Sequence, residues 1–199
     1  MIIAIQLVLR ETACATTVIT KRKQQFCLDQ ILRIKEKHSM TDFDHLVARE
    51  MHNDNLSMQL SLGKHIGDAP NLVPWEDLSE LSKEAVLWRA TFVLTKLRAI
   101  GCDIRPAKPE ESFEFVFTDK EIEKMAILEH DHWIVRKLKL GFVWGANLDG
   151  TAKPPTHPFL VPFVNLPEEQ KTRDRDFSRK IPQLLARIGY VVERKTNDA

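Results

Sequence analysis

The sequence predicts a mainly α-helical fold with short β-strands, built as a pseudo-two-fold pair of helix–loop–helix units. Three observations predict it. Apolar residues recur at helical spacing through much of the 199-residue chain. A segment in the middle of the chain has a second copy near the end. Short extended runs at 102–104 and 190–192 each follow a glycine that is placed to end a helix.

The two copies become visible when residues 72–104 are aligned with residues 160–192 without gaps. The tripeptide Leu-Val-Pro then stands at the start of both, and the copies end in Gly101 and Gly189. A single unit of this size cannot cover its own apolar face. We therefore expect the two units to pack together as a closed pair.

A helix from about Asp119 to Leu140 carries the most informative residues. Thr118 and Glu121 have the spacing of a capping box, which starts a helix, and Gly141 is placed to end it. At about 100° per residue, His130 falls on the apolar side of this helix. A polar side chain left there without a hydrogen-bond partner costs about 1–3 kcal/mol, so the partner of His130 becomes the central question.

The remaining elements follow from periodicity and from the positions of proline and glycine. We expect further helices at 21–37, 43–60, 80–100 and 167–188, the last kinked or restarted at Pro182. We expect strands at 1–9, 102–104, 113–117 and 190–192. The division that results is an N-terminal extension at 1–40, a first, degenerate copy at 41–105, a connector at 106–117, a second, full copy at 118–193 and a polar tail at 194–199.

Composition indicates a soluble globular protein. Hydrophobic residues make up 43% and charged residues 29%, and the net charge is +1, so no bulk attraction to nucleic acid or to membranes is expected. Cys14, Cys27 and Cys102 form no Cys-x-x-Cys pair, which argues against a disulfide framework and fits a reducing cytoplasm. The apolar run at 1–9 is too short to span a membrane, and we expect no membrane insertion.

A distinctive set of motifs covers residues 118–192. It comprises an acidic-His-Asp-x-Trp helix, a Gly-aromatic-x-aromatic-Gly turn, a loop with Asp and Lys, a His-Pro pair, Pro-aromatic-x-x-Leu, Lys-x-x-Asp-Arg and a closing Leu-Leu-x-x-x-Gly-Tyr. These positions are Glu129, His130, Asp131, Trp133, Gly141, Phe142, Trp144, Gly145, Asp149, Lys153, His157, Pro158, Pro162, Phe163, Leu166, Lys171, Asp174, Arg175, Leu184, Leu185, Gly189 and Tyr190. The set resembles the ryanodine receptor repeat (RyR) domain family, in a bacterial-type tandem form.

The resemblance implies a tandem pair of RyR repeats, of which the first copy lacks the Trp after the His motif and the His-Pro pair. Members of the family in calcium-release channels are cytoplasmic regulatory modules, and bacterial forms look like ligand-sensing or adaptor modules joined to Rossmann or channel-type partner domains. We therefore expect a non-enzymatic module that binds a nucleotide-like small molecule or a protein partner. The extension at 1–40 is then a candidate remnant of a domain junction. No Gly-x-Gly-x-x-Gly occurs, and no cofactor is expected.

The candidate ligand-binding residues are His130, Trp133, Trp144, Lys153 and His157. Aromatic faces can stack on a base, and a lysine can meet a phosphate as a point charge. The alternative is structural: His130 bonds a backbone carbonyl or Glu129, and the tryptophans belong to the core.

Two further cations, Lys171 and Arg175, are also candidates for ligand binding. The alternative for them is a set of salt bridges with Asp174 on a helix surface. The remaining motif positions are assigned structural roles: Glu129, Asp131, Gly141, Gly145, Asp149, Pro158, Pro162, Asp174 and Gly189.

A metal site formed by His130, His132 and His157 is not expected. Residues two apart on a helix diverge by about 200°, so the first two imidazoles cannot both bind one ion. The alternative function is that of a metal-dependent phosphohydrolase. His130 and Asp131 resemble the His-Asp pair of such enzymes, although the further metal ligands cannot be placed in the sequence. We keep this hydrolase as the alternative to a non-enzymatic module.

Overall fold

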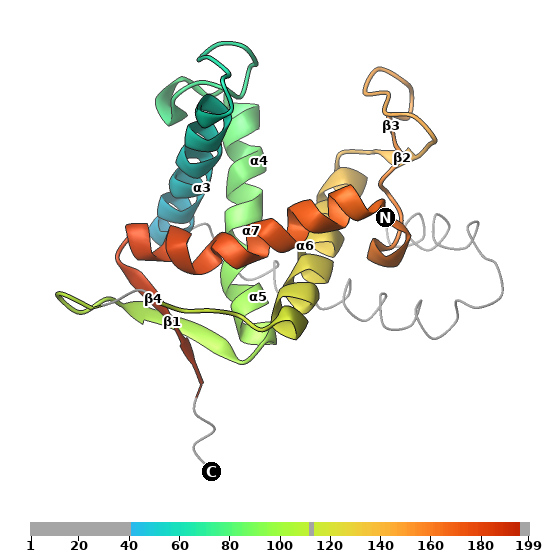
Figure 1. The fold of residues 1–199 in the computed structure, drawn as a ribbon. Coiled ribbons are helices and arrows are strands. Elements are labelled where there is room, and N and C mark those ends of the chain that lie inside the picture. The colour runs from blue at the N-terminus through green and yellow to red at the C-terminus, as the bar shows by residue number, and fades with distance from the viewer. Residues whose placement is uncertain (1–40, 112–113, 196–199) are drawn as a thin grey trace. The chain divides into compact units, whose positions relative to one another are not determined.

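The structure is a computed structural model that describes residues 41–111 and 114–195 (Figure 1). The mainly helical fold with a few short strands is confirmed. The strand expected at 1–9 and the helix expected at 21–37 lie outside the described residues. Among the helices that the structure describes, none combines the length and the apolar character that crossing a bilayer requires.

The chain divides into two compact units. We call the first the core unit; its described residues lie within 41–126 and 175–195. The second, the motif unit, has its described residues at 127–174. Helix α6 (Asp119–Lys139) begins in the core unit and ends in the motif unit, whereas α7 (Glu168–Arg187) runs from the motif unit into the core unit.

The core unit contains most of the helices and the longer strands. Helix α3 lies beside α4, and strand β1 pairs with β4 (Figure 1). Its complete elements are α3 (Asp42–Ser61), η1 (Trp75–Asp77), α4 (Glu80–Ala90), α5 (Val93–Ala99), β1 (Cys102–Pro106) and β4 (Tyr190–Arg194).

A single apolar cluster holds the core unit together. Residues from both stretches of the chain contribute to it, so burial of their apolar surface drives the association of the C-terminal part of α7 and β4 with α3 to α5. The buried members are Val47, Ala48, Met51, Leu87, Ala90, Val93, Leu97, Cys102, Phe117, Ile122, Met125, Ile181, Leu184, Leu185 and Val192.

Capping boxes start two of the helices, and the sequence predicts the one at Thr118. Thr41 accepts from the amide of Asp44 at the start of α3, and the Asp44 carboxylate accepts from the Thr41 amide. Thr118 and Glu121 make the same reciprocal pair at the start of α6. Helix α6 ends at Lys139, one residue before the predicted end. Gly141 then adopts a φ of 83°, a left-handed conformation that glycine tolerates without strain.

The single helix predicted at 80–100 is wrong, because the chain breaks at Thr91 and Phe92 into α4 and α5. The Thr91 hydroxyl donates to the carbonyl of Trp88 at 2.9 Å, and the Phe92 amide bonds the carbonyl three residues back. Such local bonds compete with the α-helical pattern. The break places Phe92 in the interior, where it is 1% exposed.

The strand predicted at 113–117 is also wrong over the residues that the structure describes, 114–117. The alternation of phenylalanines has a different cause. Phe117 is buried in the apolar cluster and Phe115 packs against it, with the two ring centroids 5.1 Å apart, while Val116 between them is exposed. Phe113 lies outside the described residues.

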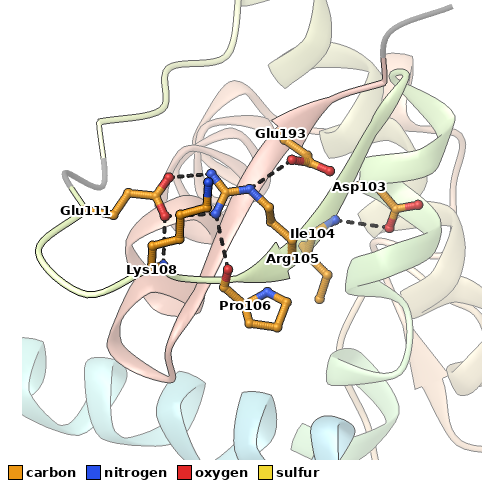
Figure 2. Close-up of polar contacts among 7 residues, drawn as sticks. All are labelled: Asp103, Ile104, Arg105, Pro106, Lys108, Glu111 and Glu193. Atoms are coloured by element: carbon orange, nitrogen blue, oxygen red, sulfur yellow. Dashed lines mark hydrogen bonds and ion pairs between the residues drawn. The ribbon is translucent and has the colours of Figure 1, made fainter. Parts of the chain in front are cut away.

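Strands β1 and β4 pair antiparallel, with Cys102 opposite Arg194 and Pro106 opposite Tyr190. Both are two residues longer than the runs predicted from sequence. Arg105 donates to Glu193 on the neighbouring strand and to Glu111 in the connector, as Figure 2 shows. The carboxylate of Glu111 also accepts from the amide of Lys108. One guanidinium therefore ties the start of the connector to the sheet.

The motif unit adds strands β2 (Val143–Trp144) and β3 (Thr156–His157) and the turn η2 (Phe163–Asn165). Strands β2 and β3 pair parallel, with Trp144 opposite His157. Helix α7 continues through Pro182 without a restart. It is followed by Gly189, whose φ of 82° again suits glycine.

Several local features agree with the alignment of 72–104 with 160–192. The turns η1 and η2 both follow a proline, Pro74 or Pro162, and both end at a buried leucine, Leu78 or Leu166. The pseudo-two-fold packing of the repeats stays a prediction. The repeat boundaries at 41–105 and 118–193 stay predictions as well, since the compact units describe packing and do not test them.

Candidate ligand-binding site

Helix α6 carries four consecutive titratable residues into the interior. Glu129, His130, Asp131 and His132 are each at most 4% exposed. Four consecutive residues cover about 300° of a helix, so α6 is enclosed on nearly all sides at this turn. Burial on this scale is unusual for charged side chains, so this turn of α6 is a candidate for a specific structural or functional role.

The hydrogen-bond partner of His130 is a backbone carbonyl. Its Nε2 lies 2.8 Å from the oxygen of Val161, and because a carbonyl only accepts, Nε2 carries the proton. The other ring nitrogen, Nδ1, lies 4.0 Å from a carboxylate oxygen of Asp174. This geometry is the structural alternative that the sequence left open: His130 fastens α6 to the segment before η2.

Burial lowers the pKa of His130 below its usual value of 6.5. The bond to Val161 and the charge of Glu129 act in the opposite direction, and His157 adds to the lowering. Desolvation outweighs the favourable contacts because the imidazolium would have to be held in a largely water-free interior. His130 is therefore neutral at neutral pH.

Trp133 contacts two imidazole rings. Its ring stacks on His130 with centroids 5.6 Å apart and an interplanar angle of 18°. It also meets His157 in a T-shaped arrangement with centroids 4.7 Å apart. Trp133 and His157 are both half-buried. Three of the five predicted ligand-binding residues, His130, Trp133 and His157, are thus brought together in one group of rings.

Lys137 lies against one of these rings and was missed as a site residue by the sequence analysis. Its ammonium nitrogen lies 4.4 Å from the ring centroid of Phe142 and 5.7 Å from that of Trp133. Lys137 follows Trp133 by four residues on α6, a spacing that places both on one face and was visible in the sequence. We call Trp133, Lys137, Phe142 and His157 the Lys137 cluster.

The Lys137 cluster contains a positive charge that no carboxylate neutralises among the described residues. Burial lowers the pKa of Lys137, and the nearby Arg136 lowers it further. Burial and the charge of Lys137 lower the pKa of His157. Over residues 41–111 and 114–195, no carboxylate pairs with Lys137; its contacts are the two aromatic rings.

Trp144 and Lys153 occupy an exposed loop of the motif unit. Trp144 is 49% exposed on β2, and Lys153 is exposed in the segment that leads to β3. Asp149 shapes this loop: one of its oxygens accepts from the amide and hydroxyl of Thr151 and from the amide of Ala152. These bonds lower the pKa of Asp149. Asp149 therefore stabilises the turn of its own loop.

Gly145 and the two motif prolines also have identifiable places. A Cβ atom on Gly145 would lie 2.7 Å from Cβ of Thr156, so the parallel pairing of β2 and β3 requires glycine there. Pro158 begins the turn after β3, and Pro162 precedes η2.

Lys171 and Arg175 are engaged in ion pairs. Lys171 lies 3.9 Å from Glu168 one turn earlier on α7. Arg175 belongs to the core unit, where its Nε and Nη2 donate to the two carboxylate oxygens of Glu123 at 2.6 and 3.2 Å. Such bidentate contacts fix a guanidinium in place. Lys171 therefore pairs within α7, and Arg175 pairs with an acid on another helix, α6.

Residues 117–194 match the family model of the RyR domain. The chain contains an RyR domain. The matched segment begins just before α6 and ends with β4, so the RyR domain includes the His130 contact, the Lys137 cluster and the β2–β3 loop. The first copy at 41–105 lies outside the match, and its assignment as a second RyR repeat stays a prediction.

The hydrolase alternative depends on a metal site around His130 and Asp131. In the part of the chain that the structure describes, no group of three or more His, Cys, Asp or Glu side chains is arranged to hold a metal ion. The Nε2 atom of His130 is already used by the carbonyl of Val161. A role for His130 and Asp131 in hydrolysis stays a prediction.

Proposed function

We propose that this protein is a non-enzymatic regulatory module of the RyR type, which senses a nucleotide-like small molecule through the motif unit. The observation that carries the proposal is the Lys137 cluster, in which a half-buried ammonium group lies against two aromatic rings beside an imidazole. Sites for nucleotides combine these elements: flat apolar faces for the base and cations for the phosphate.

The charge balance around the cluster supports an anionic ligand. Between residues 133 and 167 the cations are Arg136, Lys137, Lys139 and Lys153, whereas Asp149 is the one acidic residue. The carboxylate of Asp149 is occupied by the turn that it stabilises. An anion would therefore approach this segment without strong repulsion.

A second form of the function, a protein adaptor, is favoured by a different observation. Trp144, Leu148 and Val164 in the motif unit are 49%, 64% and 65% exposed. Large apolar side chains at the surface are typical of contact sites for other proteins. In this form the module joins a Rossmann or channel-type partner domain in the cytoplasm.

The small-molecule form is tested by thermal shift and calorimetry with AMP, ADP, ATP, NAD and the corresponding nucleosides. A ligand at one hundred times its dissociation constant should stabilise the full chain by about 2.7 kcal/mol. The effect should weaken in Trp133→Phe, which alters the stacked face, and persist in Trp75→Phe, whose ring lies in the core unit against His52. If no compound stabilises the protein, the small-molecule form is wrong and the adaptor form remains.

The same panel separates the module from the hydrolase. Nucleotides incubated with the protein and divalent metal should be recovered intact, with and without chelator. Turnover that chelation abolishes would contradict a non-enzymatic function.

A further inference from the structure

We propose that Lys137 and His157 form an anion subsite that takes the phosphate group of a nucleoside phosphate. This inference deepens the proposed function and rests on it for the identity of the rest of the ligand. It assigns the recognition of the ligand to Lys137, which lies outside the recognised motif positions, rather than to the loop lysine, Lys153.

The Lys137 ammonium lies against two aromatic rings. The nitrogen is 4.4 Å from the Phe142 centroid and 5.7 Å from the Trp133 centroid, so the two rings hold the side chain in one place. Contacts to ring faces stabilise a cation modestly but do not neutralise it. Among the described residues nothing accepts a hydrogen bond from this ammonium. A partly buried cation of this kind gains most from an added anion, because the local dielectric is lower than that of water.

His157 is a hydrogen-bond donor through its Nε2 atom. Its Nδ1 accepts from the amide of Phe159 at 3.2 Å, so in the neutral ring the proton lies on Nε2. In the described part of the chain no group accepts from that Nε2. The ring of His157 lies 4.7 Å from Trp133 and 6.4 Å from Phe142, the same two rings that hold Lys137. The Lys137 ammonium and the His157 Nε2–H group, two donors without acceptors among the described residues, therefore both lie near Trp133 and Phe142.

Cations outnumber acids in the stretch of sequence around Lys137. An ion pair within the protein would remove the need for a ligand, yet the one acid of residues 133–167, Asp149, bonds its own loop. Arg136 adds positive charge beside Lys137 on α6. A phosphate offers several oxygens and up to two negative charges, so it can accept from the ammonium and the imidazole together.

The test compares adenosine, AMP, ADP and inorganic pyrophosphate by calorimetry on the full-length wild type, Lys137→Met and Lys139→Met. The first variant keeps the apolar stem between the rings and removes the charge. The second removes an equal charge from an exposed position on the same helix. AMP should bind the wild type at least tenfold more tightly than adenosine. That advantage should vanish in Lys137→Met and persist in Lys139→Met.

The outcomes separate the subsite from the wider function. Equal affinity for adenosine and AMP would overturn the subsite and leave nucleotide sensing intact. Binding of pyrophosphate that depends on Lys137, with no binding of any nucleoside phosphate, would support the subsite and contradict nucleotide sensing. No binding of any of these probes would overturn both.

A spectroscopic measurement on the wild type guards against a variant that fails to fold. The imidazole resonances of His157, assigned by NMR with a His157→Gln sample, should shift on addition of AMP and stay in place on addition of adenosine. Identical responses to the two compounds would contradict a phosphate at this position.

Discussion

His52 and His130 make the same contact in two different parts of the chain. Nε2 of His52 lies 2.7 Å from the carbonyl oxygen of Val73, and Nε2 of His130 lies 2.8 Å from that of Val161. In both cases the valine precedes a Pro-aromatic pair, and the aromatic ring stands near the imidazole, at 5.9 Å for Trp75 and 6.2 Å for Phe163. Each imidazole fastens a helix to the start of a short turn.

Replacing His130 by alanine should lower the free energy of unfolding by about 1–3 kcal/mol, because the carbonyl of Val161 loses its donor inside the protein. Loss of the stacked ring beside Trp133 adds to the effect. Urea unfolding of wild type and variant measures it. The exposed His45 on α3 supplies the control, since His45→Ala should change the stability by less than about 0.5 kcal/mol. Equal stabilities for both variants would contradict the fastening role of His130.

Stability should also fall with acid in a way that depends on His130. Its pKa is lowered in the folded protein, by burial above all, while in the unfolded chain it returns to about 6.5. Below pH 6.5 the unfolded chain therefore binds the proton more readily, and stability decreases as the pH falls toward the folded pKa. The charged or titratable groups around the ring are Glu129, Asp174 and His157.

Unfolding titrations between pH 7.5 and 5, values chosen to bracket the histidine range, measure this dependence. His130→Asn should show a shallower decrease than the wild type. His157 contributes in the same direction, since burial and Lys137 lower its pKa as well. A variant with an unchanged slope would show that His130 titrates alike in both states.

The sequence predicts that His130 needs a hydrogen-bond partner, but it does not identify that partner. Helical periodicity placed the imidazole on the apolar side of α6, and the need for a partner followed from the cost of an unbonded polar group. The partner itself, Val161, is 31 residues away, and nothing local specifies it. The capping box at Thr118 was predictable because its bonds span three residues.

Long-range packing explains the parts of the fold and site that sequence reasoning missed. The break at Thr91 follows from the burial of Phe92 in the core, which overrides a continuous helical pattern. Lys137 had helical spacing with Trp133, but its second ring, Phe142, comes from beyond the end of α6. The sequence placed Arg175 in a charged cluster with its neighbours Lys171 and Asp174, but it could not show the bond to Glu123, which is 52 residues away.

Gly145→Ala should destabilise the β2–β3 pairing by about 1–3 kcal/mol, the usual cost of overpacking. The added methyl would lie 2.7 Å from the Cβ of Thr156, so the strand or the threonine must move. Gly150→Ala is a matched control in the same loop, because a Cβ there meets nothing within 4 Å. Hydrogen exchange of the amides of Val143 and Thr156 measures the local effect. Equal exchange in the two variants would contradict a close approach at Gly145.

Glu121 should contribute to stability only above strongly acidic pH. Bonds from Arg194, and then from Thr118, hold its pKa at about 2, compared with 4.5 in the unfolded chain. The contribution is therefore complete above pH 4.5 and is lost as the pH falls toward 2. At pH 7, Glu121→Gln should unfold more easily by roughly 1 kcal/mol, the size of a helix-cap contribution.

The difference between wild type and Glu121→Gln should shrink through that same acidic window, which thermal unfolding at a series of pH values measures. Glu84→Gln, at an exposed position of α4, provides the control and should match the wild type at pH 7. A stability difference between wild type and Glu121→Gln that stayed constant down to pH 2 would mean that the charge of Glu121 does not contribute to stability.

Helices α6 and α7 each have residues in both compact units, so they limit which fragments of this protein can fold on their own. A fragment cut to the matched boundaries, 117–194, would carry Ile122, Met125 and Leu185 without the partners that α3, α4 and α5 supply in the apolar cluster. Its exposed apolar surface would favour aggregation over folding. The recognisable family segment and the smallest autonomously folding piece are thus different objects. Deleting β4 from the C-terminus would remove Val192 from the apolar cluster to which Val47 also belongs, and would therefore destabilise the core unit.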